Sequence, residues 1–246
     1  MRLEHEHRDS TRSLFLTLTY DEENLPYFGN APCFNKKDLQ DFFKRLRHKC
    51  KFRYYVVSEY GSKTKRPHYH ALFFNFEGDI NEISKEWKKG HVHIGSVTSS
   101  SINYCAAYVI TKQHYEYDKD DPRRPFALHS RRPALGANYV ERYSRFHRDG
   151  RKNYAVRPFG AGKVSLPRYY KEKIFSKLDR NILAAETRRW VEECQTDACI
   201  SFDDFRRKNP DSDFHEYHRY RLDYIMEKNK QVFSKLKQNR NGKSNI

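Results

Sequence analysis

The sequence predicts an α+β protein in which an antiparallel sheet carries helices on one face, followed by a mainly helical C-terminal region. Three observations lead to this prediction. A strand with strict alternation lies near the N-terminus, two β-rich runs are separated by a short turn region, and apolar residues recur at helical spacing between and after them.

The first elements are a strand and a capped helix. Residues 13–20 (SLFLTLTY) alternate, so Leu14, Leu16 and Leu18 share one strongly apolar face. After a turn region, Asn35 can cap a helix over residues 36–49, in which apolar side chains fall at helical spacing and Lys and Arg occupy the opposite side.

The next elements complete the sheet. The runs 52–59 (FRYYVVSE) and 68–76 (HYHALFFNF) flank a turn region over 61–67, which predicts antiparallel neighbours. A short helix around 80–89, a strand over 91–97, and a helix that starts at Ser99 or Ser101 and reaches Gln113 follow. This order fits a split-βαβ, ferredoxin-like or RRM-like sheet whose second face is open to a ligand.

The composition changes near residue 116 to a charged, Arg-rich and Pro-containing stretch without periodicity. We therefore expect residues 1–118 to form the core and residues 119–246 to form a basic, mainly helical C-terminal region. Its predicted helices cover 167–178, about 179–193 and 214–236, and the last residues are expected to fray.

The charge balance points to a polyanionic partner. Lys and Arg number 48 against 32 Asp and Glu, a formal net charge of +16, which is typical of proteins that neutralise phosphates. No run of about 18 apolar residues or basic amphipathic helix favours a membrane instead. The first residues contain no apolar signal core, so a cytoplasmic protein is expected, and the five cysteines show no zinc spacing.

His68 and His70 are candidate metal ligands, because period-two geometry sends both imidazoles to one face of the predicted strand. Antiparallel pairing across the turn can bring the Glu59 carboxylate close to them. Two imidazoles and a carboxylate leave positions open for water and phosphate oxygens, which suits Mg²⁺ or Mn²⁺. Taken alone, the histidine pair is more often ordinary strand polarity, and Glu59 can instead pair with a lysine of the turn.

Tyr104, Tyr108 and Lys112 recur every four residues in a predicted helix, so they share one stripe. A tyrosine hydroxyl is a poor nucleophile at neutral pH, but a polarised phosphate and a nearby cation lower the barrier to a phosphotyrosine. The alternative is an aromatic stripe that packs on the sheet.

The segments FLTLTY, RPHYHALFF and YCAAYVITK, in this order, resemble the three motifs of HUH replication initiators. The two-tyrosine helix resembles the Microviridae branch, and the stretch at 160–175 is similar to gokushovirus replication initiators. The resemblance covers most of residues 13–176. It implies an HUH endonuclease core, with His68, His70 and Glu59 as metal ligands, Tyr104 and Tyr108 as nucleophiles, and Lys112 assisting.

The resemblance implies a rolling-circle initiator of phage genome replication in the cytoplasm of a bacterial host. One tyrosine cuts a single strand at the origin, keeps the 5′ end as a phosphotyrosine and leaves a 3′ hydroxyl for a polymerase. The second tyrosine serves the later cut and join. Because the sequence has no P-loop, host helicase and polymerase would be partners. Ala107 stands where related helices often have Lys or Arg, so Lys112 is expected to supply the charge.

Three questions stay open at this level. A second His-X-His pair, His91 and His93, competes with the first, which we prefer because of its place in the motif order. A non-catalytic single-strand binder with an RRM-like sheet explains the charge and topology, and a related HUH transposase or relaxase would need one tyrosine. Candidate DNA contacts are basic residues of the turn and of the C-terminal region: Arg66, Arg131, Arg132, Arg151, Lys152 and Arg157.

Overall fold

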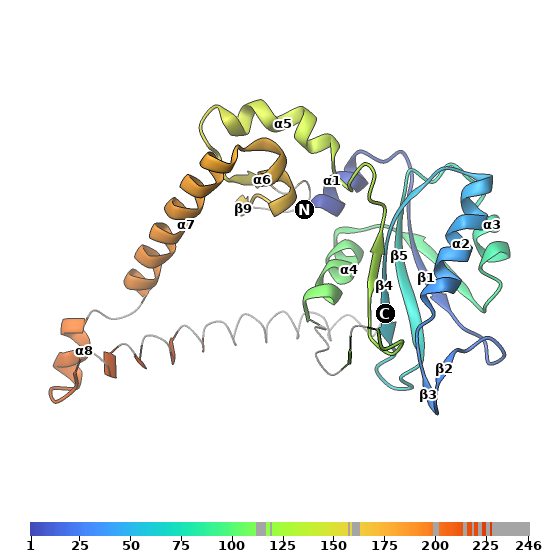
Figure 1. Ribbon diagram of the computed structural model, residues 1–246, viewed down its shortest axis with the longest axis horizontal. Helices are drawn as coiled ribbons and strands as arrows, with labels where there is room; N and C mark the ends of the chain where they lie inside the picture. The colour runs from blue at the N-terminus through green and yellow to red at the C-terminus, as the bar shows by residue number, and fades with distance from the viewer. Residues whose placement is uncertain are drawn as a thin grey trace. The chain divides into compact units, whose positions relative to one another are not determined.

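The computed structural model describes residues 1–111, 117–118, 120–156, 158, 163–198 and 202–213, with 216–217, 219–220, 223–224 and 227. For residues 108–111, 156, 163 and 190–198 it describes the backbone alone. The chain divides into two compact units, Met1–Tyr170 and Lys171–Ile246. The first unit contains the central sheet (Figure 1).

The first unit begins with the elements that form the sheet and its covering helices. They are α1 (Arg2–Arg8), β1 (Ser13–Thr19), β2 (Tyr27–Phe28), β3 (Ala31–Pro32), α2 (Lys36–Lys49), β4 (Arg53–Tyr60), β5 (Pro67–Phe74), α3 (Ile80–Trp87), β6 (Val92–Ser96) and α4 (Ser99–Thr111). β7 (Ala127–His129), α5 (Asn138–Arg148), β8 (Tyr154–Val156) and β9 (Lys163–Ser165) follow. α6 (Arg168–Ile174) begins before the division between the units and ends after it.

The five-stranded sheet has the order β6-β1-β5-β4-β7, and all its pairings are antiparallel. The predicted α+β class is therefore confirmed. The strands at 13–20, 52–59, 68–76 and 91–97 and the helices at 36–49 and 80–89 all form within a few residues of their predicted bounds. Asn35 caps α2 as expected, because its side chain accepts a hydrogen bond from the Lys37 backbone.

One face of the sheet, called the aromatic face below, is covered by α2 and α3 (Figure 1). It consists of the apolar side of β1 and alternate residues of β4 and β5, packed against rings of both helices. The fully buried rings include Tyr69, Phe73, Phe42, Phe43 and Trp87. This face is the hydrophobic core of the unit, because burial of rings is the largest apolar contribution available to so polar a chain.

The opposite face, called the site face below, is covered in part by α4, which contacts β4 and β5. The structure thus differs from the expectation that helices lie on one side alone, as Figure 1 shows for α4. Ile102 and Cys105 of α4 are buried against Val57, Leu72 and related residues in a second, smaller apolar cluster. Spacing alone predicted the helix but could not tell which face it would cover.

The N-terminal residues form a helix rather than a disordered end. In α1, His5 is 2% exposed and its ring centroid lies 4.4 Å from that of the Tyr139 ring. Glu6 forms an ion pair with Arg53 and accepts a hydrogen bond from the backbone N–H of Gly136 at 2.6 Å. These partners are distant in sequence, which is why local analysis of polar residues missed the helix.

The C-terminal part is helical where the structure describes it. In the second unit, α7 spans Lys177–Ala198 and α8 spans Phe202–Lys208. α7 includes the helix predicted over 179–193, whereas α8 was not predicted. Most of the helix predicted over 214–236 lies outside the described residues. Nothing among the described helices has the length and apolar character needed to cross a membrane.

The boundary predicted near residue 118 stays a prediction as a division of function. In the structure, β7 follows that point and still joins the sheet beside β4. The first compact unit continues to Tyr170.

Candidate metal centre and tyrosine helix

The hairpin of β4 and β5 aligns three polar side chains on the site face. In its register Glu59 lies opposite His68 and Val57 lies opposite His70. Residues two apart on a strand share a face, so both imidazoles and the carboxylate project to the same side. Tyr69 projects to the aromatic face, where burial raises the pKa of its hydroxyl, which donates to the Asn35 carbonyl.

The three side chains converge on one point. His70 Nε2 lies 3.4 Å and His68 Nε2 lies 3.8 Å from Glu59 Oε2. One possible ligand atom from each of these residues lies within 4.8 Å of the other two. Both histidines are half-buried, and Glu59 is buried. This donor set fits a divalent metal ion, because it offers two neutral nitrogens and one anionic oxygen at a single point.

Each imidazole is oriented through its other nitrogen. His70 Nδ1 is hydrogen-bonded to Thr17 Oγ1 at 3.1 Å, and His68 Nδ1 to the Arg66 carbonyl at 3.2 Å. The Phe15 ring stacks on His70 with centroids 5.5 Å apart. A bond that engages Nδ1 leaves Nε2 toward the carboxylate, which is the usual arrangement of histidines that bind metals.

Tyr104 projects from α4 into this cluster. Its hydroxyl donates a hydrogen bond to Glu59 Oε2 at 2.5 Å, and its ring stands perpendicular to that of His70 with centroids 5.2 Å apart. The adjacent Cys105 is buried, and this burial together with the charge of Glu59 raises the pKa of its thiol to about 12. A tyrosine hydroxyl, a carboxylate and two imidazoles therefore share one small volume.

The other two members of the predicted stripe are described less fully. Tyr108 belongs to α4, one turn beyond Tyr104, but its side chain lies outside what the structure describes. Lys112 lies outside the described residues. Their roles stay predictions.

The second His-X-His pair lies apart from the carboxylate. His93 of β6 is paired with Thr17, which is paired with His70, so β1 separates the two histidines. His91 and His93 are exposed. Among the residues that the structure describes, the cluster of three or more possible metal-binding side chains is the one with Glu59, His68 and His70.

The predicted DNA contacts lie in different places. Arg66, near the cluster, donates to the Tyr20 carbonyl at 2.9 Å and pairs with Glu22. Arg131 and Arg132 are exposed just beyond Ser130.

The distance of these two arginines from the cluster follows from the strand pairing. Ser130 hydrogen-bonds to Tyr54, which is five residues and therefore roughly 16 Å along β4 from Glu59. Neither arginine is thus brought to the metal cluster.

The predicted contacts beyond the sheet are described in part. The Lys152 ammonium lies 4.0 Å from the centroid of the Phe146 ring. Arg151 is exposed, and Arg157 lies outside the described residues. DNA binding by all these basic residues stays a prediction.

Sequence reasoning missed Thr17 as a part of the site. The signal was present, because Thr17 alternates with Leu16 and Leu18 and so occupies the polar side of β1. Its pairing with His70 required the sheet order, which a single sequence does not supply.

Comparison with known proteins identifies the part of the chain that carries the site. Residues 13–114 match the family of the replication-associated protein ORF2. These residues belong to that family. They contain β1, the β4–β5 hairpin and α4, and therefore all the side chains of the cluster.

Three replication-associated proteins of phages are similar to the chain. VP4 of Bdellovibrio phage phiMH2K is 32% identical over 198 residues, 70% of this chain and 61% of that protein. ORF2 of Spiroplasma virus 4 is 36% identical over 40% of this chain and 38% of that protein. ORF4 of Chlamydia phage 1 is 26% identical over 68% of this chain and 47% of that protein.

These matches confirm the predicted resemblance to replication proteins of the Microviridae, to which the Bdellovibrio and Chlamydia phages belong. The chain spans about four tenths to six tenths of the length of these relatives.

Proposed function

We propose that this protein is a metal-dependent nickase that cuts and rejoins single-stranded DNA through a 5′-phosphotyrosine and thereby starts rolling-circle replication of a phage genome. The observation that carries the proposal is the hydrogen bond from the Tyr104 hydroxyl to Glu59, the carboxylate that also faces His68 and His70. A nucleophile at a metal cluster is what phosphoryl transfer to tyrosine requires.

Each residue of the cluster has a distinct role in this proposal. His68, His70 and Glu59 would hold Mg²⁺ or Mn²⁺, which supplies polarisation of the scissile phosphate. The Tyr104 oxygen forms a bond to phosphorus while the bond from phosphorus to the 3′ oxygen breaks. The tyrosine proton passes to Glu59 Oε2, its present hydrogen-bond acceptor, and the 3′ oxygen takes a proton from water and becomes a 3′ hydroxyl primer.

The second tyrosine completes the cycle in this proposal. After one round of synthesis Tyr108 cuts the regenerated origin, and the released 3′ hydroxyl attacks the first phosphotyrosine to close a circle. Lys112 would stabilise the charge on the phosphate. A host polymerase extends the primer and a host helicase separates the strands, because the chain has no P-loop of its own.

A covalent-adduct assay tests the proposal. Purified protein is incubated with labelled single-stranded DNA from the origin region of a phage that carries this sequence, with Mn²⁺, and resolved on denaturing gels. We expect an EDTA-sensitive adduct that is absent from the Tyr104→Phe, Tyr108→Phe double variant and reduced in each single variant.

Matched histidine variants identify the metal site in the same assay. His70→Ala should abolish the adduct and lower Mn²⁺ affinity, measured by calorimetry, by roughly 100-fold or more. His93→Ala, on the neighbouring strand β6, should change that affinity less than about twofold. Tight DNA binding without adduct under any metal would instead support a non-catalytic binding protein. Loss of the adduct in one single tyrosine variant and not the other would support a single-tyrosine enzyme.

A further inference from the structure

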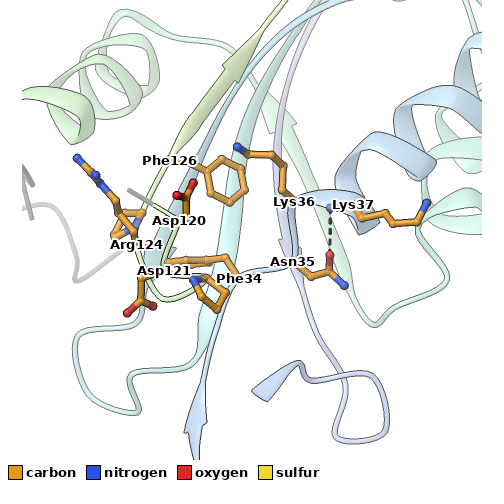
Figure 2. A pocket seen from close by; sticks show the side chains of 10 residues that line it. Phe34, Asn35, Lys36, Lys37, Asp120, Asp121, Arg124 and Phe126 are labelled. Carbon is orange, nitrogen blue, oxygen red and sulfur yellow. Dashed lines mark hydrogen bonds between the residues drawn. The ribbon is translucent and has the colours of Figure 1, made fainter. Parts of the chain in front are cut away.

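A pocket of about 450 Å³ lies at the start of α2, beside the aromatic face and away from the metal cluster. It is lined by residues 34–37 and by the segment that leads into β7, from Asp120 to Phe126. Figure 2 shows the Phe126 ring and the Lys36 side chain facing each other across it, while Lys37 extends to the other side. Its volume lies in the range of roughly 300–1,000 Å³ that small-molecule sites have.

The lining combines a ring with cations. The Lys36 ammonium lies 5.2 Å from the centroid of the Phe126 ring, and the Lys36 side chain is exposed. Arg124 supplies a second cation, and Pro122 and Pro125 add rigid apolar walls. Aromatic faces stack on unpaired bases while Lys and Arg hold the phosphate, so this is the chemistry of a nucleotide site on a single strand.

The two carboxylates of the pocket differ. Asp121 is engaged by Arg123, whose guanidinium lies 2.6 Å from it and, with burial opposing, lowers its pKa. Asp120 is exposed at the pocket. A carboxylate accepts hydrogen bonds from exocyclic amino groups, which cytosine, adenine and guanine carry and thymine lacks. Asp120 is therefore placed to favour an amino-bearing base.

The pocket wall is tied to both neighbours of Glu59. The Phe126 N–H donates to Ser58 Oγ at 2.7 Å and the Ser58 N–H donates to the Phe126 carbonyl at 2.9 Å. The Tyr60 hydroxyl donates to the Arg123 carbonyl at 3.1 Å. A ligand in the pocket is thus held at a fixed place relative to the metal cluster, through one strand of the sheet.

We propose that this pocket binds one nucleotide of the single strand that flanks the cleaved phosphate, with a preference for a base that carries an exocyclic amino group. Lys36 and Arg124 contact its phosphate, Phe126 stacks on its base, and Asp120 accepts from its amino group. The inference rests on the proposed function for the identity of the strand alone, since the pocket does not include the metal cluster or Tyr104.

Fluorescence anisotropy with labelled dC and dT ten-mers, in EDTA, tests the pocket apart from the chemistry. Lys36→Ala should weaken binding about fivefold and lower the slope of log affinity against log salt by about 0.7, the value for one phosphate contact on a single strand. Lys44→Ala, an equal charge change at an exposed position of α2, is the control and should weaken binding less than twofold. Arg124→Ala should behave like Lys36→Ala.

Asp120→Asn tests the base preference, because an amide presents a donor as well as an acceptor. We expect wild type to favour dC over dT and the variant to bind both equally. Equal effects of Lys36→Ala and Lys44→Ala, or a base preference unchanged in Asp120→Asn, would overturn the proposal.

The adduct assay separates this inference from the proposed function. An adduct in wild type together with no special effect of Lys36→Ala would remove the pocket and leave the nickase. The reverse pattern would leave a nucleotide pocket on a binding protein.

Discussion

The two faces of the central sheet are made by the same strands but contain opposite kinds of side chain. On β5, Tyr69 and Phe73 are fully buried on the aromatic face, whereas His68 and His70 lie half-buried on the site face. Residues one apart therefore serve the core and the candidate chemistry in turn. The difference teaches that stability and metal binding should respond to different substitutions, although their positions alternate along one strand.

The largest expected effect lies on the aromatic face. Phe42→Ala removes a fully buried ring that packs on Phe43, Phe73 and Trp87, so it should lower the free energy of unfolding by about 3–5 kcal/mol. Chemical denaturation measures this change. Mn²⁺ affinity of the folded protein should stay within about twofold of wild type, and a larger change would break the separation of the faces. Tyr27→Ala, at an exposed ring, is the control.

A smaller effect is expected on the site face. Thr17→Val keeps the shape of the side chain but removes the hydroxyl that contacts His70 Nδ1, so Mn²⁺ affinity should fall by about 10- to 100-fold. Thr17→Ser should retain most of the affinity. Calorimetry measures both variants, and denaturation in EDTA checks that the free energy of unfolding is unchanged. An equal loss in Ser and Val would mean that Thr17 acts through packing alone.

The smallest effect concerns α1, which contacts α4. Burial is the main cause that lowers the pKa of His5 from 6.5 to about 4. Between those values the unfolded chain binds a proton that the folded chain does not, so stability falls as the pH drops, by up to about 1.4 kcal/mol per pH unit. His5→Phe should remove this slope, while His48→Gln, at an exposed position of α2, should retain it. Urea unfolding at several pH values between 4 and 7 measures the slope, and an unchanged slope in His5→Phe would contradict the assignment.

Much of the sheet was predictable because its strands have strong local patterns. Residues 13–19 alternate cleanly, and the run 68–74 places buried residues and histidines on opposite faces. The approach of Glu59 to His68 also followed from the sequence, since a short turn region between two strands favours antiparallel pairing.

Other features depend on partners far along the chain. β7 has three residues and follows a Pro- and Arg-rich stretch, so no local pattern predicted that it would join β4. The burial of Glu6 depends on Arg53 and Gly136, and the orientation of His70 depends on Thr17 across the β1–β5 pairing. Local spacing contains no information about such contacts.

The three candidate metal ligands lie on one hairpin, whereas Tyr104 comes from a helix further along the chain. Their contacts span few residues, so the ligand cluster can assemble as soon as β4 and β5 pair, before α4 docks. The nucleophile arrives with a separate element that touches the hairpin through a small apolar cluster. Evolution can therefore change the number or spacing of tyrosines on this helix without rebuilding the metal ligands, since the two parts meet only at Glu59 and its immediate neighbours.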